Sequence, residues 1–294
     1  MRSLLFIPAD DEHKLAKGLA TGADALIIDL EDSVSAARKP AARAVAKAYI
    51  AANVARQPRP QILVRINALD TAFWQEDLVG VIDARPDAIL LPKARSGEDV
   101  HTLSVALGEA EQRAGKPGHA TRIIALTTET PISLLKMHTY VGASTRLIGL
   151  TWGAEDLSAA IGARSNREAD GRTWTSPFRL ARDLCLLTAA AAAVAAIDTV
   201  FVNFRDADGF RAECVAAARD GFSGKMAIHP NQVAIINEAF TPSADEIATS
   251  EAIVKAFTDN PEAGVIAIAG QMVDKAHVAR AERLLARAKA ARSG

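Results

Sequence analysis

Hydrophobic residues in this chain are concentrated in eight short runs that recur along most of its length. Most of the runs are almost continuously apolar, whereas a strand with one face in water would alternate apolar and polar residues. Short continuous runs of this kind are typical of parallel strands that are covered on both faces. The sequence therefore predicts eight buried parallel strands, at residues 3–8, 25–30, 61–67, 88–93, 122–127, 146–151, 199–204 and 225–230.

A segment compatible with a helix follows each run, so strands and helices alternate along the chain. The first run begins at Ser3 and the last at Lys225, a mean spacing of roughly 32 residues, which fits eight units in a barrel of about 250 residues. An open doubly wound sheet is the alternative, but the chain has neither a GxGxxG nor a GxxxxGK[ST] phosphate-binding loop. We expect an α/β fold, a (β/α)8 TIM barrel.

The chain continues beyond the eighth unit. We expect a catalytic barrel domain at residues 1–240 and a C-terminal helical lid or appendage at residues 241–294, too small to have a core of its own. Within the appendage we predict a helix at residues 245–257, a short apolar run at 264–270 and a final helix from Lys275. A long polar loop at residues 162–177 is expected to serve the active site, as long loops after barrel strands usually do.

Composition and charge narrow the range of partners. The net charge is −1 and the pI about 6.6, which gives no indication of binding to nucleic acid or to a membrane surface. The apolar run near the N-terminus is too short for a signal peptide, so we expect a cytoplasmic protein. Cys185 and Cys214 lie in expected helices without a CxxC spacing, which favours buried reduced thiols.

Polar and charged residues gather at the predicted C-terminal ends of the runs, where active sites of such barrels lie. Glu129 and Asp156 follow the fifth and sixth runs, which are neighbours, so their carboxylates can converge on one cation. Mg²⁺ prefers one or two carboxylates, with water and substrate oxygens as its other ligands. We expect Mg²⁺, or Mn²⁺ in its place, between them. The alternative is that both acids stabilise the first turn of a helix.

Further candidates lie near the same strand ends. The backbone N–H groups of Gly153, Ala154 and Glu155 are expected at a helix start, where they suit the carboxylate of a substrate. Glu31 and Asp32 follow the second run, and they either support the metal ligands or cap a helix.

Two cations occur where the strands should be buried. Arg65 lies in an otherwise apolar run, where an unpaired guanidinium would be costly. It needs an anionic partner, either a structural carboxylate or a substrate oxygen. Lys93 is expected to form a salt bridge with an acid at a neighbouring strand end. His229 is expected to hold a loop, and Trp152 and Trp174 are expected to pack against other side chains.

With these residues in place, nearly the whole chain resembles the citrate lyase β-subunit family (CitE-like) of the HpcH/HpaI aldolase superfamily, close to malyl-CoA and citramalyl-CoA lyases. Taken singly the motifs are weak, but their order is specific. One departure is Ala9, where the family commonly has Gly. The segments that carry the resemblance are RSLLFIPAD, GADALIIDLEDSV, VRIN, LPK, TTETP, GAEDLSAAIG and GFSGKMAIHPNQV.

The resemblance implies Mg²⁺ held by Glu129 and Asp156, and substrate contacts from Arg65. It implies cleavage or formation of the C–C bond of a 3-hydroxyacyl thioester such as malyl-CoA or citramalyl-CoA, with a 2-oxo acid and acetyl-CoA as the products of cleavage. It also implies trimers, or multiples of trimers, in which Asp274 of one subunit acts as acid/base in a neighbour's site. Candidates for binding the CoA phosphates are Lys14, Lys17, Arg38, Lys39 and Arg43.

Three other functions remain as alternatives. A class II aldolase acting on free 2-oxo acids shares the metal pair but generally lacks a lid like the one expected here. A citrate lyase β-subunit acts on a carrier-bound thioester, which requires an open mouth. A barrel without catalysis that serves as a binding partner is disfavoured by the retained Glu129, Asp156, Arg65 and Asp274.

Overall fold

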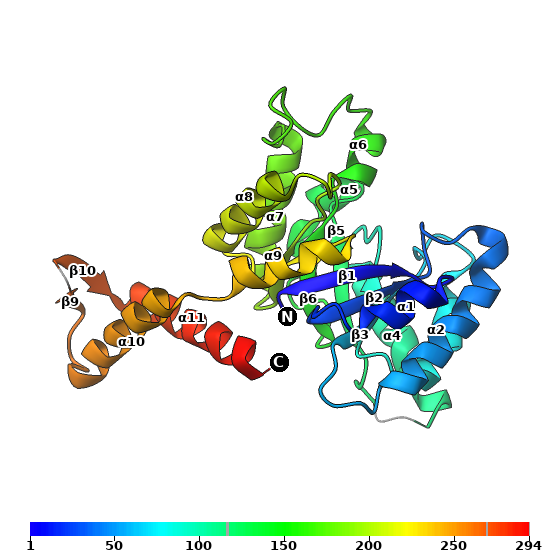
Figure 1. The fold of residues 1–294 in the computed structure, drawn as a ribbon, viewed down its shortest axis with the longest axis horizontal. Helices are drawn as coiled ribbons and strands as arrows, with labels where there is room; N and C mark the ends of the chain where they lie inside the picture. Colours follow the sequence, from blue (N-terminus) through cyan, green and yellow to red (C-terminus); the bar gives the residue numbers. More distant parts are fainter. Residues whose placement is uncertain (116–117, 269, 294) are drawn as a thin grey trace.

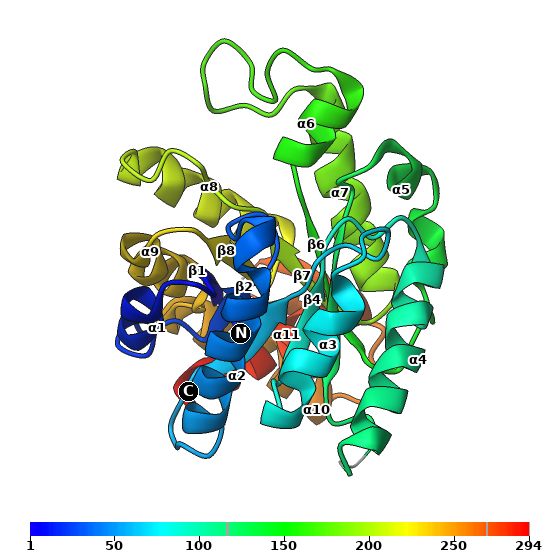
Figure 2. The ribbon, with the colours of Figure 1, turned by 90° about the vertical axis from the view of Figure 1, so that its right-hand side faces the viewer.

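The computed structural model describes residues 1–115, 118–268 and 270–293. Eight parallel strands close into a barrel, because β1 pairs with both β2 and β8 (Figures 1 and 2). This confirms the predicted fold class. The strands are β1 (Ser3–Pro8), β2 (Ala25–Asp29), β3 (Gln61–Arg65), β4 (Ala88–Leu91), β5 (Arg122–Thr127), β6 (Leu147–Trp152), β7 (Ala195–Asp198) and β8 (Gly224–Ala227).

Helices connect successive strands and cover the outside of the barrel (Figure 2). They are α1 (Glu12–Gly18), α2 (Lys39–Asn53), α3 (Trp74–Val81), α4 (Gly97–Arg113), α5 (Pro131–Leu135), α6 (Glu155–Ile161), α7 (Ser176–Ala191), α8 (Ala207–Asp220) and α9 (Pro230–Phe240). Three short 3-10 turns, η1 (Ala36–Arg38), η2 (Ile82–Ala84) and η3 (Met137–Tyr140), complete the connections that the described residues contain.

The strands bury both of their faces, which explains their continuous apolar character. In β1, Leu4 belongs to a cluster that fills the barrel, whereas Leu5 and Ile7 pack outward against the helices. Cys185 and Cys214 are buried free thiols in α7 and α8, as expected. No helix in the described part of the chain has both the length and the apolar composition needed to cross a bilayer.

The seventh strand was predicted at residues 199–204, and this placement is wrong. The strand is β7, Ala195–Asp198, and it pairs with β6 and β8. The error has a physical origin. Alanine is the strongest helix former, so the Ala-rich segment reads as helix, and the β-branched and aromatic residues after it read as strand. The chain instead leaves α7 at Ala191 and turns at Ala193, whose φ is +54°.

The appendage follows α9 and consists of α10 (Ala244–Asp259), a hairpin of β9 (Val265–Ile268) and β10 (Gln271–Asp274), and α11 (Lys275–Ser293). The predicted helices match α10 and α11. Ala269, part of the expected apolar run, lies outside the described residues. The expectation that this piece has no core is wrong, because Ile253, Val273 and Ala281 form a small buried cluster between its elements.

The appendage leaves the barrel at the end where the strands begin. Thr241, just after α9, accepts a hydrogen bond from Arg2, which directly precedes β1. In Figure 1 the dark-blue arrow of β1 points away from α10, β9, β10 and α11. The appendage therefore lies opposite the mouth of its own barrel, the end at which the strands finish.

Close packing at Gly97, the first residue of α4, generates a prediction about stability. A Cβ at this position would lie 1.9 Å from the carbonyl oxygen of Thr139. We expect Gly97→Ala to lower the free energy of unfolding by about 1–3 kcal/mol, as overpacking usually does. Gly118→Ala is the control, because a Cβ there meets no atom within 4 Å. Equal urea midpoints for the two variants would contradict the prediction.

Candidate active site

A cavity of about 340 Å³ opens at the C-terminal ends of the strands. Its wall combines charged groups with an apolar side formed by residues such as Phe6, Leu126, Val200 and Met226. Its charged and polar lining comes from the ends of several strands and from the first turn of α6, as expected for the active end of a barrel. These lining residues are Asp29, Ser33, Arg65, Glu129, Glu155, Asp156 and Thr199.

Glu129 is held in this cavity by the local fold of two adjacent strand ends. Thr128, directly after β5, has a φ of +72°, an uncommon conformation for a β-branched residue. Gly153 leaves room for the Glu129 side chain, since a Cβ on Gly153 would lie 2.8 Å from Glu129 Cγ. The backbone N–H of Lys93 donates to Glu129 Oε2 at 2.5 Å. The carboxylate is buried as a result, with 4% of its surface exposed.

Burial raises the pKa of Glu129 well above its ordinary value, and the negative charges of Asp156 and Glu31 raise it further. Asp156 lies in the first turn of α6, 3.5 Å from the ammonium group of Lys93. Glu129 and Asp156 line the same cavity, so the structure brings the predicted pair together. A cation between them would stabilise the charged form of Glu129.

Arg65 has carboxylate partners, one of the two alternatives that the sequence left open. Its Nε and Nη2 donate to the two oxygens of Asp29 at 2.7 Å each, and Nη1 lies 2.8 Å from Glu31 Oε2. The hydrogen bonds to Asp29 use two of the five N–H groups of a guanidinium, and the contact with Glu31 is an ion pair. Arg65 also lines the cavity. Burial acts to lower the pKa of Arg65, but Asp29, Glu31 and Glu129 raise it above the ordinary value.

Lys93 forms salt bridges, as predicted, but not with a neighbouring strand end: Glu31 and Asp32 follow β2 and Asp156 follows β6, whereas β4 lies between β3 and β5. Its ammonium lies 2.5 Å from Glu31 and 3.1 Å from Asp32, and its φ of +49° marks another tight turn at a strand end. Glu31 thus connects Arg65 and Lys93, and Asp32 reaches the site only through Lys93. Burial raises the pKa of Glu31, and the charges of Arg65 and Lys93 oppose that rise.

The balance of charge in this cluster fits a divalent cation. Arg65 and Lys93 are surrounded by the carboxylates of Asp29, Glu31, Asp32, Glu129 and Asp156. Within the described residues, no group of three His, Cys, Asp or Glu side chains has the geometry to enclose a metal by itself. Two protein carboxylates beside an open cavity are the arrangement that Mg²⁺ accepts, because it retains water and substrate oxygens as further ligands.

The amides predicted to bind a carboxylate also line the cavity. Gly153 and Ala154 connect β6 to α6, and Glu155 is the first residue of α6. The N–H of Gly153 is 3.3 Å from the hydroxyl of Thr128, so it already has a partner. The Glu155 side chain accepts a hydrogen bond from Asn166 in the long loop between α6 and α7.

Two of the residues predicted to bind CoA are corrected by the structure. Lys39 is buried and donates to the backbone oxygens of Leu30 and Glu31. Arg43 is buried against Asp77 and Glu76. Both charges have partners within the protein near the end of β2, so neither side chain is available to bind CoA.

The other three CoA candidates are on the surface. Lys14 pairs with Asp11, Arg38 pairs with Asp10, and Lys17 is exposed on α1. They stay predictions.

Asp274 lies at the end of β10, on the side of the barrel opposite the cavity (Figure 1). It accepts hydrogen bonds from the backbone N–H groups of Ala276 and His277, and its carboxylate is 2.6 Å from the His277 ring. These contacts with His277 lower its pKa. Within its own chain, Asp274 therefore caps α11 and does not line the cavity.

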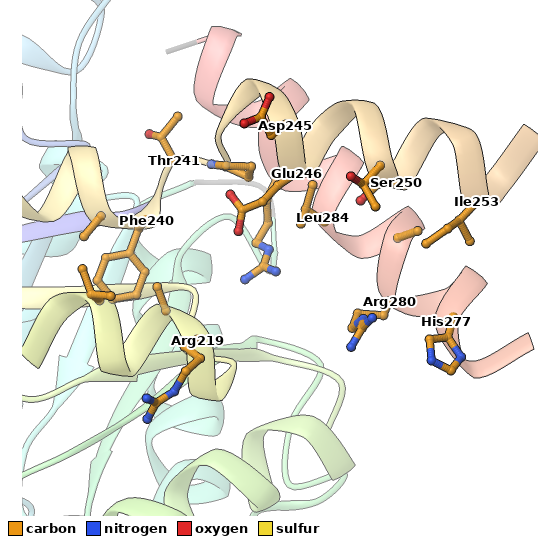
Figure 3. Close-up of a pocket in the computed structure, with 17 residues that line it drawn as sticks. Arg219, Phe240, Thr241, Asp245, Glu246, Ser250, Ile253, His277, Arg280 and Leu284 are labelled. Atoms are coloured by element: carbon orange, nitrogen blue, oxygen red, sulfur yellow. The ribbon is translucent and has the colours of Figure 1, made fainter. Parts of the chain in front are cut away.

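A larger cavity, of about 590 Å³, lies between the barrel and the appendage. Figure 3 shows Arg219 from α8 and Phe240 from α9 on one side, facing His277 and Arg280 from α11. The metal-site carboxylates are absent from its lining, which mixes arginines with acids and apolar residues. The smaller cavity at the strand ends is therefore the candidate active site.

Sequence reasoning missed part of the cavity wall. Thr199 lines the cavity because it directly follows β7, whereas the predicted strand end at Asn203 and Arg205 lies in a loop away from the cavity. Ser33, Met226 and Ile228 were also missed. His229, as expected, is structural: its ring accepts from the N–H of Asn231 at the start of α9. Trp152 and Trp174 pack edge to face, also as expected.

Residues 2–230 match the HpcH/HpaI aldolase/citrate lyase family. The citrate lyase subunit beta of Leuconostoc mesenteroides subsp. cremoris is 33% identical over 291 residues, covering 98% of this chain and 93% of its own length. A (3S)-malyl-CoA thioesterase of Cereibacter sphaeroides (strain ATCC 17025 / ATH 2.4.3) is 33% identical over 296 residues, covering 98% of this chain and 95% of its own.

A solved structure extends this similarity to three dimensions. The CitE protein of Mycobacterium tuberculosis, in complex with magnesium, acetoacetate and coenzyme A, superposes with a TM-score of 0.76 and 33% identity, covering 98% of each chain. Sequence and architecture agree over almost the full length. The chain belongs to the HpcH/HpaI aldolase/citrate lyase family.

Proposed function

We propose that this protein is a Mg²⁺-dependent carbon–carbon lyase that acts on a 3-hydroxyacyl-CoA thioester such as malyl-CoA or citramalyl-CoA. The observation that carries the proposal is the buried carboxylate of Glu129, paired with Asp156 in a cavity that also contains Arg65. The M. tuberculosis neighbour, crystallised with magnesium, acetoacetate and coenzyme A, supports the metal and the class of substrate. Mn²⁺ shares the preference for oxygen ligands and is the expected substitute.

Glu129 and Asp156 would hold the metal, which when bound polarises the keto and carboxylate oxygens of the 2-oxo acid. Cleavage breaks the bond between C2 and C3 of the acyl chain while the 3-hydroxyl gives its proton to water, and the uptake of one proton at carbon later restores the balance. The electron pair of the broken bond remains on the thioester as an enolate. Arg65 has N–H groups beyond the two that donate to Asp29, and it offsets this charge.

The remaining lining residues orient the acid and exclude water. The backbone N–H groups of Ala154 and Glu155 are at the start of α6, a position that favours a bound carboxylate. An apolar wall strengthens charge interactions inside the cavity because it lowers the local dielectric constant. This wall is formed by Phe6, Leu126, Val200 and Met226. The proposed contacts for the CoA phosphates are the exposed side chains of Lys14, Lys17 and Arg38.

The enolate must receive one proton at carbon to leave as acetyl-CoA. We assign this step to Asp274 of a neighbouring subunit in a homotrimer or a multiple of trimers, with residues 241–294 acting as the lid. The position of the appendage supports this assignment, since it leaves the barrel beside Arg2, opposite the mouth of its own chain. Closing over a neighbour's mouth would also exclude water.

Two related reactions are the alternatives, each favoured by a relative. The Leuconostoc relative is a citrate lyase subunit beta, and the Cereibacter relative is a malyl-CoA thioesterase. A panel of malyl-CoA, citramalyl-CoA and citryl-CoA with Mg²⁺ distinguishes them. Glyoxylate or pyruvate together with acetyl-CoA supports the proposal, and oxaloacetate indicates the citrate lyase reaction. Free CoA with malate indicates hydrolysis. Turnover that persists at full rate in EDTA would exclude the metal-dependent mechanism.

Glu129→Gln tests the metal site through stability. The pKa of Glu129 in the folded protein lies above 4.5, so the folded protein binds the carboxyl proton more tightly than the unfolded chain does. The protonated carboxyl group therefore stabilises the fold at low pH, and this stabilisation is lost as the pH rises through the folded-state pKa. In EDTA, the stability of the wild type relative to Glu129→Gln should therefore fall as the pH rises above about 5. Saturating Mg²⁺ should stabilise the wild type alone.

Urea unfolding measures both effects, and exposed Glu262→Gln is the control. Mg²⁺ binding of wild-type strength in Glu129→Ala or Asp156→Ala, measured by calorimetry, would contradict the metal assignment.

Arg65→Lys should lower kcat about 100-fold or more, because an ammonium cannot contact Asp29, Glu31 and the enolate together. Arg59 offers a matched control, since its guanidinium also makes two hydrogen bonds with one carboxylate, that of Asp87, at the opposite end of the barrel. Arg59→Lys should lose stability to a similar extent but keep its rate. If Arg65→Lys loses no more activity than Arg59→Lys, the role of Arg65 is structural.

Asp274→Asn should lower the rate about 10²- to 10⁴-fold, as removal of an acid/base group does. Asparagine caps helices as well as aspartate, so α11 should be unaffected. Mixing Asp274→Asn chains with Glu129→Ala chains should restore activity, because some sites then receive both intact residues. Asp259→Asn at the end of α10 is the control. If subunits exchange and no activity returns, Asp274 does not act in a neighbour's site.

A further inference from the structure

A buried ion-pair network lies beside the cavity and takes no part in the proposed chemistry. Lys225, on β8, is fully buried, and its ammonium contacts Asp198 at 2.6 Å and Glu213 at 2.8 Å. Asp198, at the end of β7, also accepts a hydrogen bond from the Trp152 ring at 2.7 Å. A buried lysine is costly unless its partners are well placed, so this network fixes the relative positions of β6, β7, β8 and α8.

The network extends outward to the 163–175 loop, the connection between α6 and α7. The second carboxylate oxygen of Glu213 is 2.7 Å from Arg167 Nη2. The Arg167 guanidinium stacks on Trp174, 3.1 Å from the ring centroid, and Nη1 donates to the carbonyl oxygen of Arg172. Arg167 and Trp174 also form a backbone bridge. Arg167 therefore joins the two sides of the loop and attaches them to α8.

The same loop contacts the start of α6. Asn166, next to Arg167, donates from its side chain to Glu155 Oε1 at 2.8 Å. Glu155 lines the cavity and directly precedes Asp156. Trp174 meets Trp152 with ring centroids 4.9 Å apart, so the loop also packs on the end of β6. In Figure 2 the loop projects beyond α6.

We propose that Arg167 is a positioning residue for the active site. Its simultaneous contacts with Glu213, Trp174 and Arg172 hold the 163–175 loop in one conformation. The ordered loop keeps Asn166 against Glu155, which fixes the first turn of α6 at the edge of the substrate cavity. The effect on turnover rests on the proposed function, whereas the ordering of the loop does not.

Limited trypsin digestion measures the ordering directly. The carbonyl group that Arg167 holds belongs to the bond cleaved after Arg172. Arg167→Ala should increase cleavage after Arg172 several-fold, because local opening exposes a bond to proteases. Arg164→Ala removes an exposed arginine from the same loop and should leave this rate unchanged. Mass spectrometry of the fragments identifies the site, and equal cleavage in the two variants would overturn the proposal.

Kinetic measurements test whether loss of loop order alters substrate binding in the cavity. Arg167→Ala should raise KM roughly tenfold and change kcat less, because a displaced wall affects substrate positioning before chemistry. Asn166→Ala should raise KM to a similar extent while cleavage after Arg172 stays at the wild-type rate. A wild-type KM in both variants would overturn the positioning role. If the wild type turns over none of the thioesters, the proposed function fails, and the trypsin comparison still decides the ordering of the loop.

Discussion

The excess of carboxylates around a buried cavity is the constraint on which the rest of the site depends. Arg65 and Lys93 are surrounded by five carboxylates, those of Asp29, Glu31, Asp32, Glu129 and Asp156. In the interior, like charges that lack counter-charges raise each other's pKa, and Glu129 shows this effect. The barrel maintains the arrangement because the acids come from the ends of three strands, β2, β5 and β6, and the closed sheet prevents the strand ends from moving apart. A cation is the simplest way to relieve the repulsion while keeping Glu129 ionised.

The barrel, and the position of Glu129 and Asp156 in one cavity, could be predicted from the sequence because their signals are local. Continuous apolar runs at regular spacing indicate buried parallel strands, and acids after two consecutive runs indicate neighbouring strand ends. The seventh strand was misplaced because its residues, Ala195–Asp198, have helical propensity. Strand pairing with β6 and β8 overrides that propensity, and pairing is a non-local effect that composition does not reveal. Thr199 was lost from the predicted cavity wall for the same reason.

Arg65 and Lys225 show how the same signal can be used or overlooked. Each is a cation in an otherwise apolar strand, so each requires buried anionic partners. The partner of Arg65 lies on the adjacent strand β2, where the sequence already placed acids. The partners of Lys225 include Glu213, which lies on α8 and has no distinguishing pattern. Lys39 and Arg43 failed as CoA ligands because side-chain direction, which depends on packing, decides whether a helix cation faces solvent.

The position of the appendage has a consequence for assembly. In each chain the cavity is at one end of the barrel and Asp274 is at the other. Under the proposed arrangement the contact between subunits is head-to-tail, since it joins two different surfaces. Such contacts either close into a ring or continue as an open filament, depending on the rotation between successive copies. The angle at which α10 leaves Thr241 would therefore decide between a closed assembly with every site complete and a chain in which the cavity of one terminal copy lacks a neighbour's Asp274.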